Sequence, residues 1–234
     1  MCGRYVTPDE AALERFWNLD RRIWNPLRER FNVAPTTAVP IIRRADDGAH
    51  ELCAARWGLI PHWWSKEKPP TLTFNARSED AAVKPMWRHA YHHARCLMPA
   101  LGWYEWREQG PADAGAGRRR ARKQPYFIYC EASPIIAFAG LMAHWRGPDG
   151  HVVVSCALLS RAAAPSIAEI HDRMPVVLPP GSFEPWLAPE LSAEDVGNLI
   201  AGARGDFVGY PVSTRVNDTR NDAPDLLDEV SDAP

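Results

Sequence analysis

The sequence lacks the features that mark several large classes of protein. No apolar run approaches the roughly 20 residues of a membrane-spanning helix, so we expect no membrane partner. The N-terminus has no basic stretch followed by an apolar one, because Glu10, Glu14 and Arg15 arrive early, and a secretory signal peptide is not expected. The net charge of −2 excludes a polycation. Together these absences predict a cytoplasmic protein.

Cysteine is scarce and follows no metal or disulfide pattern. The five cysteines are odd in number and widely spaced, with no Cys-x-x-Cys pair, which argues against a disulfide scaffold and against a zinc site. His89, His92 and His93 crowd one predicted helix, but no cysteine or acidic partner lies near them in the sequence. We therefore interpret these histidines as a solvated face and expect neither a metal nor another cofactor.

The overall composition is typical of a globular protein, but two segments have strongly biased compositions. Its 234 residues suffice for one large domain or two small ones, and 22 prolines and 10 tryptophans suggest loops and aromatic surfaces rather than a helical bundle. Residues 110–123 are a low-complexity run of Gly, Ala and Arg, which predicts a flexible basic insertion. Residues 221–234 carry five acidic residues and no lysine or arginine, which predicts a flexible acidic tail after a mildly basic domain of residues 1–220.

Short β-branched and aromatic runs separated by turn residues dominate the chain, with helical patterns placed irregularly between them. We expect strands at 38–43, 51–57, 71–74, 95–99, 102–106, 125–130, 135–145, 151–159, 176–178 and 207–212. We expect helices at 8–17, 87–94, 163–170, 182–187 and 193–203. The pattern indicates an α+β fold, a single domain with a largely antiparallel, barrel-like β core and several short peripheral helices.

The N-terminal stretch Met1–Tyr5 has unusual chemical potential. A small residue at position two generally allows removal of Met1, which would leave Cys2 with a free α-amine beside its thiol. An α-amine titrates near ~7.7–8.0, so a useful fraction is neutral and nucleophilic at cellular pH. Such an amine attacks an aldehyde to give an imine, and the neighbouring thiol then closes a five-membered thiazolidine in an intramolecular step.

Three further residues at expected strand or helix ends can take part in chemistry with Cys2. They are Asn75, Glu105 and His171, which supply an amide donor, a carboxylic acid and an imidazole. Strand alternation places Glu105 on the same face as Trp103, in an aromatic setting. A thiol, an amide, an acid and an imidazole form a workable set for covalent chemistry at a carbonyl carbon.

Nine short motifs follow one another along the chain. They are Cys-Gly-Arg-Tyr (2–5), Asn-Val-Ala-Pro-Thr (32–36), Arg-Trp-Gly-Leu-Ile-Pro (56–61), Asn-Ala-Arg-Ser-Glu (75–79), Arg-Cys-Leu-Met-Pro-Ala (95–100), Trp-Tyr-Glu-Trp (103–106), Phe-Ala-Gly-Leu (138–141), Ile-His-Asp-Arg-Met-Pro-Val (170–176) and Val-Asn-Asp-Thr-Arg-Asn-Asp (216–222). Together they resemble the SRAP family, named from "SOS response-associated peptidase", over nearly the whole chain. The chain departs from the family pattern at Leu101-Gly102-Trp103 and at residues 155–161, and neither departure includes a residue of the candidate set.

The resemblance implies a barrel-like α+β domain that senses abasic sites in single-stranded DNA, including single-strand/double-strand junctions, and shields them in the DNA damage response. Cys2 would form a thiazolidine DNA–protein crosslink with the open-chain aldehyde of the abasic sugar. Glu105 would act as general acid and base in opening the sugar, and His171 would shuttle protons. Asn75 would hold the α-amine or a sugar oxygen. We expect a monomer, at the nucleoid if the cell is bacterial.

The DNA contacts implied by the resemblance are arginines next to the reacting residues and aromatic side chains. Guanidinium groups clamp phosphates bidentately, and indole rings offer stacking surfaces for bases. The expected phosphate contacts are Arg4, Arg77 and Arg173, and the expected stacking residues are Trp63, Trp64 and Trp106.

Two other functions remain open from the sequence. One is a thiol autopeptidase, or another hydrolase with an N-terminal nucleophile, in which Cys2 attacks an acyl group; no oxyanion motif is identifiable for it. The other is a single-strand-binding module without catalysis, for which Cys2→Ala would be silent. The crosslinking hypothesis, which includes a possible lyase activity, predicts instead that Cys2→Ala binds DNA and forms no adduct.

Overall fold

The computed structural model describes residues 2–17, 19–22, 28–70, 73–109 and 123–231. Met1 lies outside these ranges. The predicted basic insertion lies outside them except for Lys123, and so does the beginning of the strand expected at 71–74.

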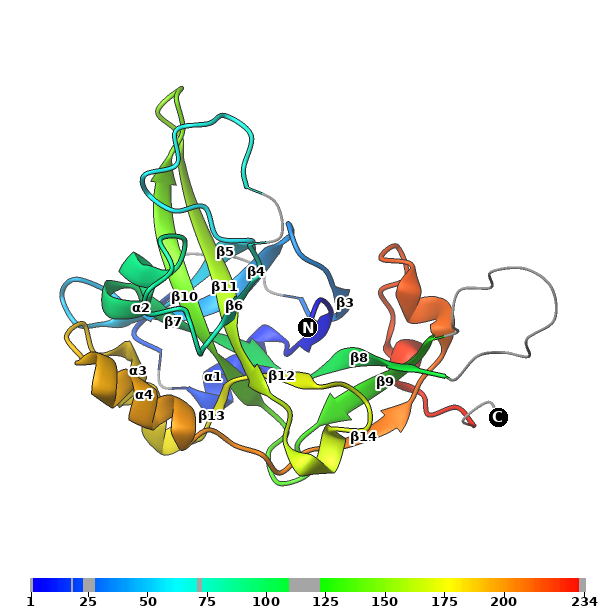
Figure 1. The fold of residues 1–234 in the computed structure, drawn as a ribbon. Coiled ribbons are helices and arrows are strands. Elements are labelled where there is room, and N and C mark those ends of the chain that lie inside the picture. The colour runs from blue at the N-terminus through cyan, green and yellow to red at the C-terminus, as the bar shows by residue number, and fades with distance from the viewer. Residues whose placement is uncertain (1, 18, 23–27, 71–72, 110–122, 232–234) are drawn as a thin grey trace.

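A five-stranded barrel forms the centre of the described chain (Figure 1). Its strands are β4 (Ala38–Arg44), β5 (His50–Trp57), β7 (Arg95–Ala100), β10 (Ile136–Arg146) and β11 (Val152–Ala162). Antiparallel pairing runs from β11 through β10, β7 and β4 to β5. Parallel pairing between β5 and β11 then closes the ring. The predicted barrel-like, largely antiparallel core is confirmed.

The barrel strands are buried on both faces, which explains their long apolar runs. Along β11, Cys156 and Leu158 pack with Phe138 in one core cluster. Their neighbours Ala157 and Leu159 point the other way, into a second cluster formed with the helices. Strands of this kind give a strong sequence signal because nearly every position is apolar.

A second sheet lies beside the barrel and carries the N-terminal strand in its interior. In spatial order its strands are β14 (Val208–Pro211), β9 (Lys123–Tyr129), β8 (Gly102–Glu108), β1 (Tyr5–Thr7) and β3 (Arg30–Val33). A Cβ at Gly102 would overlap the Ile128 carbonyl oxygen, so glycine lets β8 and β9 approach closely. We did not predict β1 or β3, because each is a strand of three or four residues that exists through pairing with distant partners.

The described residues form four short α-helices around the barrel, and α2, α3 and α4 lie on the side away from β8 and β9 (Figure 1). The helices are α1 (Glu10–Phe16), α2 (Arg88–His93), α3 (Phe183–Leu187) and α4 (Ala193–Ala201). Helix α1 begins later than predicted, because Asp9 caps it by accepting from the Ala12 N–H at 2.6 Å. Within the described ranges, no helix is long and apolar enough to cross a membrane.

The remaining elements are short. They are strands β2 (Arg21–Arg22), β6 (Asn75–Arg77), β12 (Arg173–Pro175) and β13 (Val177–Leu178), and 3₁₀ helices η1 (Pro165–Ile167), η2 (Pro180–Ser182), η3 (Thr214–Asn217) and η4 (Pro224–Leu227). The helix predicted at 163–170 is wrong: β11 extends to Ala162, and only the three residues of η1 are helical. Of the strand predicted at 71–74, the described residues 73–74 are not in a strand, and pairing begins at Asn75, opposite Leu158.

The acidic C-terminal segment is docked rather than flexible as far as Ser231, which corrects the predicted tail. Leu226 is buried in a cluster with Val212 and Val216. Glu229 forms a β-bridge with Val212. Carboxylates of this segment pair with nearby residues, as in the Arg215–Asp225 ion pair at 2.5 Å. The segment is therefore ordered although its composition is acidic.

Candidate active site

Cys2 is placed by strand pairing that begins three residues later. Strand β1 pairs with β8 through Tyr5 opposite Trp103, and the Tyr104 N–H donates to the Arg4 carbonyl oxygen at 3.0 Å. Cys2 is 0% exposed, and its Sγ donates to the same Arg4 carbonyl at 3.6 Å. Burial raises the pKa of the Cys2 thiol well above its ordinary value, so the resting group is a thiol rather than a thiolate.

Asn75 holds the main chain of Cys2. It is the first residue of β6, which lies parallel to β11. Its Nδ2 donates to the Cys2 carbonyl oxygen at 2.7 Å. Its buried Oδ1 has no hydrogen-bond partner among the described residues. Asn75 therefore fixes one atom of Cys2 and keeps an acceptor available beside it.

Glu105 brings a carboxyl group to the same place from β8. Trp103 belongs to the core cluster that includes Cys2, on which the Glu105 charge acts, whereas Tyr104 and Trp106 belong to a cluster on the other face. The predicted alternation is confirmed. Glu105 is 2% exposed, and burial raises its pKa to about 7. The acid is thus populated in both protonation states near neutral pH, as a general acid and base requires.

His171 faces Glu105 with one ring nitrogen and is fixed through the other. Its Nδ1 accepts from the Arg173 backbone N–H at 2.9 Å, so in the neutral ring the proton resides on Nε2. Nε2 lies 3.7 Å from Glu105 Oε2. Asp172 Oδ1 also lies 3.0 Å from Nδ1, but this carboxylate is largely exposed and its influence is screened. Burial lowers the pKa of His171, which favours the neutral ring.

The structure thus brings Cys2, Asn75, Glu105 and His171 together from four separate segments. The Cys2 carbonyl oxygen accepts a hydrogen bond from Asn75, and the Glu105 charge also raises the pKa of the Cys2 thiol. His171 lies 3.7 Å from Glu105. A buried thiol, an acid with a pKa near neutrality and a neutral imidazole can move protons at a carbonyl carbon without a metal ligand set. Among the described residues, no group of three or more His, Cys, Asp or Glu side chains is arranged to hold a metal ion.

The six side chains expected to contact DNA divide by exposure. Arg77 is exposed at the end of β6, and Trp63 is 48% exposed. Trp64 is half-buried, with its Nε1 donating to the Lys68 carbonyl at 3.0 Å. Trp106 is also half-buried, with its Nε1 donating to Asn217 Oδ1 at 2.7 Å.

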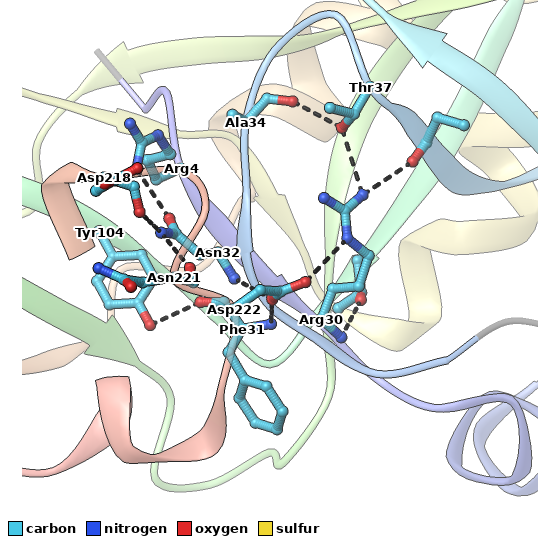
Figure 2. A network of polar contacts seen from close by, with 12 residues as sticks. Arg4, Arg30, Phe31, Asn32, Ala34, Thr37, Tyr104, Asp218, Asn221 and Asp222 are labelled. Atoms are coloured by element: carbon cyan, nitrogen blue, oxygen red, sulfur yellow. Dashed lines mark hydrogen bonds and ion pairs between the residues drawn. The ribbon is translucent and has the colours of Figure 1, made fainter. Parts of the chain in front are cut away.

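The other two arginines are engaged with protein acceptors. Arg173 forms a bidentate ion pair with Glu79, at 2.5 and 2.9 Å, and donates to the Ser160 carbonyl at 2.8 Å. Arg4 donates to Asn32 Oδ1 at 2.9 Å (Figure 2). It also donates to the main-chain oxygens of Val216 and Asn217. We assigned no role from the sequence to Asn32, which accepts from Arg4, or to Asp222, which accepts from the Asn32 backbone N–H. Their place in two of the nine motifs was the available signal.

A large cavity in the described part of the chain is remote from these residues. It has a volume of about 840 Å³ and is lined by β4, α2 and β10, with His62, His89 and His144 among its walls. None of the four candidate catalytic residues lines it. Its walls mix arginines with Asp46 and Asp47, so it carries no clear charge preference.

Comparison with known proteins gives one consistent family. The family described as "SOS response associated peptidase (SRAP)" matches residues 1–219. The abasic site processing protein YoqW of Bacillus subtilis (strain 168) is 32% identical over 234 residues, covering 97% of this chain and 99% of its own. The abasic site processing protein YedK of Escherichia coli (strain K12) is 32% identical over 240 residues, covering 98% and 100%. A crystal structure of a Bacteroides thetaiotaomicron protein superimposes with a TM-score of 0.72 at 26% identity, covering 86% of this chain and 85% of that chain.

Proposed function

This chain belongs to the SRAP family, and on that premise we propose that it captures abasic sites in single-stranded DNA as a covalent thiazolidine crosslink through Cys2. The observation that carries the proposal is the placement of Cys2 between Asn75 and Glu105, with the acid held near neutral pKa by burial. The α-amine, freed by removal of Met1, and the thiol are then presented beside an acid that functions at cellular pH.

The reaction balances with the loss of one water. Glu105 in its acid form protonates the ring oxygen of the abasic sugar, the ring C–O bond breaks, and the C1 hydroxyl gives its proton back to the Glu105–His171 pair, which leaves the open-chain aldehyde. The neutral α-amine of Cys2 adds to the aldehyde carbon, and water leaves to give an imine. The thiol then adds to the imine carbon and its proton passes to nitrogen, so one C–N and one C–S bond have formed. His171 Nε2, 3.7 Å from Glu105, relays protons between these steps.

The thiazolidine protects the DNA strand from the imine that precedes it. An imine at this carbon acidifies the neighbouring position and opens a lyase path, β-elimination with strand breakage. Addition of sulfur removes the C=N bond and closes that path. Intramolecular closure is fast because thiol and imine belong to one residue. The product is a stable DNA–protein crosslink that shields the lesion, at the nucleoid if the cell is bacterial.

DNA binding in this proposal uses the exposed candidates first. Arg77 follows Asn75 by two residues and is open to a phosphate, and Trp63 is open to a base. Arg173 already holds a carboxylate in the bidentate geometry that a phosphate would take, so a phosphate would exchange with Glu79. The substrates are single strands and single-strand/double-strand junctions that carry the lesion.

Acyl transfer by Cys2, as in an autopeptidase, has less support. The thiolate is the nucleophile in that reaction, and burial holds the pKa of the Cys2 thiol above its ordinary value. The crosslinking route starts from the amine and uses the thiol second, as a neutral S–H group, which suits a buried thiol.

Intact mass spectrometry tests the proposal. The protein is weighed before and after incubation with uracil-containing single-stranded DNA treated with uracil glycosylase. We expect a starting mass without Met1, and an adduct equal to protein plus DNA minus one water that survives heat without borohydride. Cys2→Ala should bind the DNA and form no such adduct. Loss of Met1 without any adduct would refute the proposal and favour acyl transfer or simple DNA binding.

A further inference from the structure

The C-terminal strap, which we define as residues 216–222, is bonded to the N-terminal arm, residues 2–4. Arg4 reaches across to it and donates to the Val216 carbonyl at 2.5 Å and the Asn217 carbonyl at 3.2 Å. More than 200 residues separate these groups in the sequence, yet they meet beside β8. Figure 2 shows Arg4, Asn32 and the strap residues Asp218, Asn221 and Asp222 in one polar network.

Asn32 is the centre of this network. It is 1% exposed, and its Nδ2 lies within hydrogen-bond distance of the Val216, Asp218 and Asn221 carbonyl oxygens, at 3.1, 3.1 and 2.8 Å. Its Oδ1 accepts from Arg4 at 2.9 Å. A buried amide with both ends satisfied fixes the elements it joins, because every alternative position leaves a polar group unpaired.

Asp222 anchors the strap at its other end. Its Oδ1 accepts from the backbone N–H groups of Phe31 at 2.6 Å and Asn32 at 3.0 Å. Its Oδ2 lies 3.5 Å from Arg30 Nε. The carboxylate therefore bonds the strap to β3, the strand that pairs with β1.

Arg4 connects this network to the reacting residue. Its side chain is held by Asn32 and the strap, and its main-chain oxygen accepts from both the Tyr104 N–H and the Cys2 Sγ. Between Arg4 and Cys2 there is only Gly3, the most permissive residue of the backbone. The covalent chain alone thus leaves Cys2 loosely placed, and non-covalent contacts must locate its amine and thiol.

We propose that Arg4, Asn32 and Asp222 form a positioning network that sets the reactive geometry of Cys2, with Arg4 acting through the N-terminal arm rather than as a phosphate contact. This inference rests on the proposed crosslinking function. Three hydrogen bonds to protein acceptors already use three of the five N–H donors of Arg4 and fix the orientation of its guanidinium toward Asn32 and the strap. Attack by the amine and closure by the thiol converge on one carbon, and a displacement of about 1 Å can cost on the order of 10²-fold in rate.

The test separates binding from reaction in Arg4→Ala, Arg4→Lys and Asp222→Asn. Non-covalent affinity and its salt dependence are measured on undamaged single-stranded DNA, and crosslinking is measured with abasic DNA as a function of DNA concentration. We expect wild-type affinity, salt slope and half-saturating concentration, with a maximal crosslinking rate lower by about tenfold to a hundredfold. Arg4→Lys should recover part of the rate, since an ammonium reaches one of the acceptors.

Two further variants complete the design. Arg220→Ala is the matched control, because Arg220 lies in the same strap with its side chain 88% exposed and paired to Asp218 at 2.6 Å. It should react at the wild-type rate. The Arg4→Ala/Asp222→Asn double variant should be no slower than the slower single variant, because both changes act through one network. Thermal melting of each protein identifies any variant that fails to fold, and Asp222→Asn, which conserves shape, serves as the mildest probe.

The outcomes distinguish this inference from the proposed function beneath it. If the wild type forms no heat-stable adduct, the crosslinking function itself is wrong. If the wild type crosslinks but Arg4→Ala loses affinity, flattens the salt dependence by about one charge and keeps its maximal rate, Arg4 is a phosphate contact and the positioning role is refuted. Wild-type binding and wild-type rate in folded Arg4→Ala and Asp222→Asn would refute it equally.

Discussion

Replacing Glu105 by glutamine should stabilise the protein in a pH-dependent manner while removing its proposed acid. The side chain is buried, and its pKa is raised from an ordinary value of 4.5 to about 7. Glutamine has nearly the same shape and carries no ionisable proton. The variant therefore removes the energetic effect of ionising a buried carboxyl group and leaves its packing in place.

The sign and size follow from proton linkage. Between pH 4.5 and pH 7 the folded state keeps a proton on Glu105 that the unfolded state has released, so the contribution of this group to stability is complete below pH 4.5 and is lost as the pH rises through 7. At about 1.4 kcal/mol per pKa unit, the full loss is about 3 kcal/mol, of which about 2.5 kcal/mol falls between pH 5 and pH 8. Glu105→Gln should thus gain stability relative to the wild type across that interval.

Urea unfolding at pH 5, 6, 7 and 8 measures the difference directly. The matched control is Glu108→Gln on the same strand, whose exposed carboxylate pairs with Lys123 at 2.8 Å and has a lowered pKa. The control should show no gain with rising pH. Parallel stability curves for Glu105→Gln and the wild type would show that Glu105 ionises normally. A loss of stability at high pH would show that its carboxylate is held by a positive charge, and either result refutes the role of burial.

Three further predictions follow from single contacts. Asn75→Ala removes the 2.7 Å hydrogen bond to the Cys2 carbonyl. Because this bond positions Cys2 and carries no charge, its loss should slow crosslinking by about tenfold or more and leave DNA affinity unchanged. Equal crosslinking rates in the variant and the wild type would contradict this prediction. Glu79→Gln should release Arg173 from its ion pair and raise single-strand affinity several-fold, by about the effect of one charge, with a steeper salt dependence in anisotropy titrations. Weaker binding would mean that Glu79 orients the guanidinium instead. Leu226→Ala should lower unfolding free energy by about 2–4 kcal/mol, whereas Val83→Ala, at an exposed site, should change it little.

The strands of the barrel could be predicted because burial on both faces makes them long and apolar. The strand predicted at 135–145 matches β10 (Ile136–Arg146) closely, as the one at 38–43 matches β4 (Ala38–Arg44). Strand β1 could not be found in this way. Its three residues have no local pattern, and its existence depends on Tyr5 lying opposite both Val33 and Trp103, contacts that only the complete sheet supplies.

Composition gave a wrong prediction for the C-terminal segment, because its acidic side chains pair with nearby groups. The segment from residue 221 has the acidic, proline-containing character of a disordered tail. Its charges nonetheless have specific partners, since Asp222 bonds to backbone N–H groups of β3 and Asp225 pairs with Arg215. Leu226 then adds a buried apolar anchor. A few well-partnered residues are enough to order a segment whose average composition predicts disorder.

The candidate site followed from the order of motifs rather than from any local spacing, because its residues arrive through pairings between distant strands. Motif membership alone does not separate reacting residues from supporting ones, as two asparagines show. Asn32 has donors and acceptor all committed to protein partners, so it can only hold structure in place. Asn75 donates to Cys2 and has a buried acceptor without a described partner. A buried acceptor of this kind can bind a substrate donor, and we therefore predict that Asn75 contacts the substrate and that Asn32 supports the site.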